Sequence, residues 1–104
     1  MLKSKNLQHY LNTEPTKGII RIYNLESDKS LLIKSNNIIE DSKNIRFQLD
    51  LGFYNNMNLQ QEYTKIGLEL FAIEPILFVE NEESLDDLYD KAKKILDEKN
   101  VTYY

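Results

Sequence analysis

The sequence contains no cysteine, and this absence removes several classes of chemistry at once. A chain without cysteine has no disulfide framework, no thiol nucleophile and no thiolate metal site, although its compartment stays open. Glycine is also scarce. The three glycines, Gly18, Gly52 and Gly67, stand far apart, so there is no glycine-rich phosphate loop. The single histidine, His9, falls on an expected short helix over Lys3–Leu11 and is interpreted as an exposed helix residue.

Long apolar runs are missing as well. No stretch reaches the roughly 18 apolar residues of a membrane span, and the first residues lack the apolar centre of a secretory signal. We therefore expect a cytoplasmic protein without a membrane partner. The net charge of -4 disfavours non-specific nucleic-acid binding, which needs a surplus of lysine and arginine. With 41% hydrophobic and 29% charged residues, the composition fits one folded domain over 1–104.

Three segments have the composition of β-strands. Two β-branched runs, over 18–23 and 30–34, are close enough in sequence to form a hairpin. The apolar run over 70–79 is predicted to pair with the first of them. Pro75 places this third strand at a sheet edge, because proline cannot donate to a β-ladder. The predicted sheet is therefore antiparallel.

Helical spacing of apolar residues predicts the remaining elements. Helices are expected over about 38–51, over about 59–66 and over about 84–99. The segment 35–37 is expected to supply the N-cap of the first and Ser84 that of the last, and Gly52 is the expected end of the first. The order α-β-β-α-α-β-α gives an α+β fold in which a three-stranded antiparallel sheet is flanked by helices. Three aromatic residues on apolar faces are expected in the core: Tyr63, Phe71 and Phe78.

Segments in the middle of the chain resemble the GIY-YIG nuclease family. Gly18–Asn24 (GIIRIYN) resembles the opening strand, and Lys29–Asn37 (KSLLIKSNN) resembles the second strand and the helix start after it. Leu49–Asn56 (LDLGFYNN) resembles the end of that helix and the following loop. Asn58–Gly67 (NLQQEYTKIG) and the strand after it complete the resemblance, which covers 17–80. It implies the same three-stranded sheet flanked by helices.

The resemblance also implies that the catalytic set is absent. The two signature tyrosines are replaced by Ile20 and Leu31, and the glycine of the second motif by Ile33. Asp41 stands at the helix arginine, and Leu77 stands near the metal-binding glutamate. Phosphodiester hydrolysis needs a metal ion and a cation beside the developing phosphoryl charge. We therefore expect no catalytic residue, no metal and no cofactor.

One position of the family's site keeps a usable group. Tyr54 falls at a loop histidine or tyrosine, so a divergent metal-dependent endonuclease using Tyr54, Tyr23, Glu74 or Glu80 is an alternative. In a strand, however, an offset of three residues changes the face and moves a side chain about 10 Å. Neither glutamate is then a simple substitute for the ligand lost near Leu77.

The chain is interpreted as a non-catalytic GIY-YIG-like domain, a binding or interaction module with an unknown protein partner or self-association. It resembles the small bacterial GIY-YIG-like proteins that lack the catalytic set, some of which carry names relating them to LuxR-type regulators. The four apolar positions of the former site either extend the core or form an exposed interface. A DNA- or RNA-binding regulator without cleavage is a further alternative, with phosphate contacts from Arg21, Lys34, Lys43 and Arg46.

Overall fold

The computed structural model describes residues 16–80 and 82–104, so the expected helix over Lys3–Leu11 and His9 lie outside the described residues. None of the described helices is long and apolar enough to cross a bilayer. The other expected helices and strands are present, and the α+β class is confirmed. The elements in chain order are β1 (Gly18–Asn24), β2 (Lys29–Ser35), α2 (Ile38–Leu51), α3 (Met57–Ile66), the short 3-10 helix η1 (Leu68–Leu70), β3 (Phe71–Phe78), α4 (Leu85–Glu98) and β4 (Thr102–Tyr103).

The strands form one sheet in the order β3-β1-β2-β4. β1 and β2 form the expected antiparallel hairpin, and β3 pairs with β1 at the sheet edge, as Pro75 predicts. The fourth strand was not expected, because β4 pairs in parallel with β2 at Lys29 and Ser30. After α4 the chain turns through Asn100, whose φ is 59°. The predicted three-stranded antiparallel sheet is therefore corrected to a four-stranded mixed sheet.

Polar caps set the helix boundaries. The Asn37 side chain accepts a hydrogen bond from the backbone N–H of Glu40 at the start of α2. Ser84 does the same for the N–H of Asp87 at the start of α4. α2 ends at Gly52, whose φ of 86° is a left-handed conformation that favours glycine. The N-cap predicted within 35–37 falls at Asn37, and the cap predicted at Ser84 and the helix end predicted at Gly52 are confirmed, because these signals are local.

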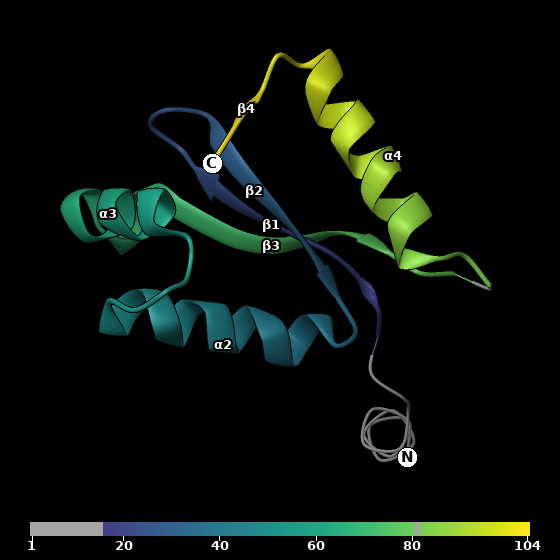
Figure 1. Cartoon of the computed structure of the whole chain (residues 1–104), viewed down its shortest axis with the longest axis horizontal. Coiled ribbons are helices and arrows are strands. Elements are labelled where there is room, and N and C mark those ends of the chain that lie inside the picture. Colours follow the sequence, from purple (N-terminus) through teal and green to yellow (C-terminus); the bar gives the residue numbers. More distant parts are fainter. Residues whose placement is uncertain (1–15, 81) are drawn as a thin grey trace, which may run out of the picture.

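Helices cover both faces of the sheet and create two cores. α2 and α3 lie on one side and α4 on the other (Figure 1). Side chains alternate along β1, so Ile20 enters the core beneath α2 and α3, and Ile19 enters the core beneath α4. Tyr63 and Phe71 belong to the first core, with ring centroids 5.2 Å apart. The prediction that Phe78 is also core is wrong. At the end of the edge strand it is 50% exposed.

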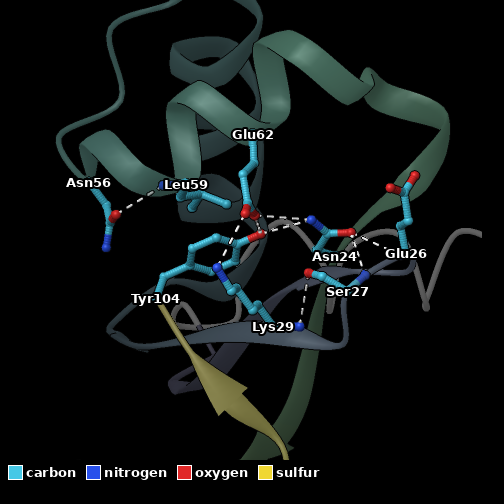
Figure 2. Close-up of polar contacts among 8 residues, drawn as sticks. All are labelled: Asn24, Glu26, Ser27, Lys29, Asn56, Leu59, Glu62 and Tyr104. Carbon is cyan, nitrogen blue, oxygen red and sulfur yellow. Dashed lines mark hydrogen bonds and ion pairs between the residues drawn. The ribbon is translucent and has the colours of Figure 1, made fainter.

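A polar network ties Tyr104 to α3 and to the β1–β2 turn (Figure 2). Asn24 is fully buried and donates from Nδ2 to Glu62 Oε2 at 3.1 Å and to the Tyr104 hydroxyl at 3.0 Å. The Tyr104 hydroxyl donates to the same carboxylate. The other oxygen of Glu62 pairs with Lys29 Nζ at 3.3 Å. Asn24 Oδ1 also accepts from two backbone N–H groups of the following turn. Three segments that are remote in sequence are joined in this way.

This network makes the fold sensitive to acid. The hydrogen bond from Tyr104, with those from Lys29 and Asn24, lowers the pKa of Glu62 below its ordinary value of 4.5. Burial and the bond to Glu62 raise the pKa of Tyr104 to about 12, so it remains a neutral donor at physiological pH. Because the folded pKa of Glu62 is depressed, its stabilising contribution is present above about pH 4.5 and is lost as the pH falls through the folded value.

We expect the free energy of unfolding of the wild type to fall more steeply below about pH 5 than that of Glu62→Gln, because the variant has no carboxylate to protonate there. Urea denaturation followed by circular dichroism between about pH 7 and about pH 3 measures both slopes. Parallel slopes for the two proteins would show that the network contributes nothing that depends on this ionisation.

Candidate functional site

Three of the positions that the resemblance assigns to a former active site lie on the side of the sheet that faces α2 and α3. Ile20 is fully buried and stands opposite Ile33 across the β1–β2 pair. Leu31 stands opposite Ile22, one pair further along, and Leu31 and Ile33 are half-buried against the same core. α2 packs over β1 and β3 rather than over β2. Ile20 is therefore part of the core, and Leu31 and Ile33 pack against it with part of each side chain still exposed.

Asp41 and Tyr54 belong to the same side of the molecule. Asp41, in the first turn of α2, accepts a hydrogen bond from the Ser35 hydroxyl at 2.5 Å. Tyr54 follows α2 and packs half-buried against the core, where burial raises its pKa. Its backbone N–H donates to Gln60 Oε1 at 2.9 Å. A shallow groove of about 450 Å³ beside it is lined by Gly52, Tyr54, Met57, Gln60, Gln61, Thr64 and Lys65.

Leu77 does not join these residues. The pairing of β1 with β3 shifts between Ile19 and Ile20, so Leu77 stands opposite Ile19 and Pro75 stands opposite Ile20. Leu77 consequently packs in the core beneath α4, on the other side of the sheet. The prediction that four apolar side chains line one former active site is therefore wrong for Leu77, and a local irregularity of the β-ladder is the reason.

The four cations proposed to contact phosphate are also divided between the two sides. Arg21 projects toward α4, donates from Nε to the Ser30 hydroxyl at 2.8 Å and stacks 3.9 Å from the centre of a tyrosine ring. Lys34 pairs with Asp86 of α4 at 2.9 Å. Lys43 and Arg46 are exposed on α2, beyond the other face of the sheet. The described residues therefore provide no single basic patch built from these four cations.

The groups considered for a divergent nuclease are similarly separated. Glu74 stands opposite Arg21 in the β1–β3 pair and so shares its face, whereas Tyr54 packs on the opposite side. The Tyr23 hydroxyl donates to Asp28 at 3.0 Å, which raises the pKa of Tyr23. Glu80 is exposed beyond the end of β3. Throughout 16–80 and 82–104, no group of three histidine, aspartate or glutamate side chains is placed to hold a metal ion.

An exposed apolar row on α2 is a feature that the sequence analysis missed. Phe47 is 61% exposed, Leu51 57% and Ile39 45%. Phe47 and Leu51, here called the α2 outer row, point away from the side of the helix that buries Ile45 and Leu49, whereas Ile39 lies at the flank of the helix. The sequence does contain a signal for this surface. A helix that buries one face normally has a single apolar stripe, whereas this helix has apolar residues on both faces.

Comparison with known proteins agrees with this architecture. No protein-family profile matches the sequence, and no curated protein matches it. Among solved structures, the chain is similar to the one described as the catalytic domain of homing endonuclease I-TevI. The TM-score is 0.62 at 20% sequence identity, over 81% of this chain and 88% of that chain. This chain has a GIY-YIG-like fold. At this level of identity the likeness concerns the fold, and activity has to be argued from the residues at the site.

Proposed function

We propose that the chain is a catalytically degenerate GIY-YIG-like domain that acts as a protein-interaction module. The observation that carries the proposal is the content of the former active site. Ile20 and Leu31 offer no hydroxyl, and Asp41 brings a negative charge where the developing phosphoryl charge needs a cation. Relationship to the LuxR-like branch of small bacterial proteins belongs to the same proposal and rests on the sequence resemblance.

A metal ion does not fit the described residues. Leu77 has no ligating atom and faces the core beneath α4. Glu74 lies on the opposite side of the sheet from Tyr54, so the two cannot share one ion or one scissile phosphate. Burial raises the pKa of Tyr54, which makes it a poorer base at neutral pH. These arguments favour a binding role over divergent hydrolysis.

Nucleic-acid binding without cleavage is supported less well. Lys34 is paired with Asp86, and Arg21 lies on the face away from Lys43 and Arg46. Phosphate binding depends on several cations acting on one backbone, and the net charge of -4 opposes it further. The more prominent free surface is the α2 outer row, which is apolar.

We expect no cleavage when the protein is incubated with plasmid or branched DNA and magnesium or manganese, because the groups that would hold the metal are dispersed. Gel assays measure cleavage, and fluorescence anisotropy at low salt measures DNA and RNA binding. Cleavage that is lost in Tyr54→Phe would overturn the proposal in favour of a nuclease. Salt-sensitive binding that is lost in Lys43→Ala and Arg46→Ala would instead favour a nucleic-acid-binding regulator.

A further inference from the structure

The α2 outer row has the form of a contact surface rather than of scattered apolar residues. Phe47 lies nine residues after Ile38, about two and a half helical turns, and so points away from the core that buries Ile38. Leu51 follows one turn later on the same side. The two side chains are 61% and 57% exposed. Adjacent large apolar side chains on one exposed helix face are typical of an interface.

Two opposite charges flank Phe47 at nearly equal distances. Lys43 lies four residues before it and Asp50 three residues after it, about 6 Å and about 4.5 Å along the helix axis. Both charges are exposed, and both line one shallow groove beside Phe47. Asp50 is held in place by the Tyr63 hydroxyl, which donates to Oδ1 at 2.5 Å.

The position of Asp50 is unfavourable within its own helix. It lies in the last turn of α2, where a carboxylate opposes the helix dipole, and that turn contains no basic residue. A cation that approaches Asp50 from outside would offset this unfavourable interaction with the helix dipole. Within the described residues, the ion pairs that form join Lys29 to Glu62 and Lys34 to Asp86, so neither Lys43 nor Asp50 takes part in one.

We propose that the α2 outer row is the docking surface for a second copy of this chain, which packs its own α2 antiparallel across a two-fold axis near Phe47. The two-fold rotation makes the two helices run in opposite directions. Lys43 of one copy and Asp50 of the other therefore lie at nearly the same height, within about 1.5 Å of each other along the helix direction. The same pair forms twice, and Phe47 meets its own counterpart. A surface that is complementary to itself is what an isologous dimer requires.

A second copy fits this face better than a nucleic acid or a differently charged partner does. The face carries two cations, Lys43 and Arg46, beside two carboxylates, Asp50 and Glu40, so a ligand with charges of one sign only would meet repulsion as well as attraction. Antiparallel packing also sets the positive end of one α2 against the negative end of the other. This inference rests on the proposed function and specifies its partner.

Sedimentation equilibrium over a range of protein concentrations tests the proposal. The wild type is expected to form dimers, and Phe47→Asp to raise the dissociation constant about a hundredfold by removing the central aromatic anchor. The matched control is Ile95→Asp, an exposed apolar residue on α4 whose replacement should leave association unchanged. The inference would be overturned by a wild type that stays monomeric at every concentration. It would also be overturned if Phe47→Asp and Ile95→Asp weakened dimerisation equally.

Charge reversal tests the register of the pairing. Lys43→Glu and Asp50→Lys should each raise the dissociation constant about tenfold, and the double variant should restore it, because the exchange preserves both interchain pairs. Thermal melts identify any loss of folding that follows from removing the acceptor of Tyr63. If the double variant is folded but its dissociation constant does not return to that of the wild type, the proposed Lys43–Asp50 pairing is contradicted.

The absence of cysteine allows a sharper experiment. Phe47→Cys lies near the two-fold axis and should form an interchain disulfide under mild oxidation. Leu51→Cys should not, because its two copies are separated by about 12 Å along the helices, beyond the reach of a disulfide. Cross-linking of both variants at equal rates would contradict the arrangement.

The dimer proposal and the proposed function can fail independently. DNA cleavage would overturn the proposed function and leave these association results untouched, so the two failures are distinguishable.

Discussion

Gly18→Ala is expected to lower the free energy of unfolding by about 4 kcal/mol, the largest effect that we predict for a single methyl group in this chain. A β-carbon at this position would lie 2.2 Å from the carbonyl oxygen of Leu77 and 3.2 Å from Cγ2 of Ile38. The first contact is with backbone, which cannot move away without breaking the β1–β3 pairing at Gly18 and Phe78. Urea denaturation followed by circular dichroism measures the change.

The neighbouring Lys17→Ala serves as the control, because Lys17 is exposed and its side chain can be shortened without a clash. We expect that variant to lie within about 0.5 kcal/mol of the wild type. A loss of less than about 1 kcal/mol in Gly18→Ala would mean that β3 can shift away from β1 at little cost. In that case the close approach would not be the reason for glycine at this position.

Asn24→Ala is expected to cost about 3 kcal/mol, because one substitution removes several hydrogen bonds from a fully buried site. The Oδ1 atom of Asn24 satisfies two backbone N–H groups of the β1–β2 turn, and Nδ2 donates to Glu62 and to the Tyr104 hydroxyl. Alanine leaves the two turn N–H groups without this acceptor and removes both donated bonds of a side chain that is itself fully buried. Chemical denaturation measures the loss, and the exposed Asn36→Ala is the control.

A double-mutant cycle locates the origin of that cost. Tyr104→Phe removes one donor to Glu62 and should cost about 1 kcal/mol alone. If Asn24 and Tyr104 act through one network, the double variant should lose less than the sum of the two single losses. Strict additivity would indicate that Asn24 stabilises only the turn. The cycle thereby separates a local contribution from a tertiary one.

The stability of this fold and the chemistry of a nuclease active site place different demands on the same strands. Gly18 is needed because the backbone of β3 passes close to it. Ile20 and Leu31, which the sequence resemblance aligns with the signature tyrosines, contribute apolar contacts to the core beneath α2 and α3. A domain can therefore keep the architecture and lose the active site, since the packing requirement is satisfied by any side chain of suitable size and polarity.

Local patterns in the sequence were sufficient for much of the architecture. The hairpin, the caps at Asn37 and Ser84, the helix stop at Gly52 and the edge position of β3 were all predicted correctly. Each depends on a few neighbouring residues whose backbone preferences or hydrogen bonds act over one turn or one strand. The resemblance in 17–80 predicted the same fold independently, and the likeness to a solved structure supports it.

Long-range pairing decided the remainder. A one-residue slip between β1 and β3 moved Leu77 to the opposite core, and the return of the chain after α4 added β4 beside β2. The buried role of Asn24 depends on Glu62 and Tyr104, which lie 38 and 80 residues away along the chain. Strand register changes the face on which every later side chain lies, and it is set by contacts between distant segments. No local pattern in the sequence carries that information.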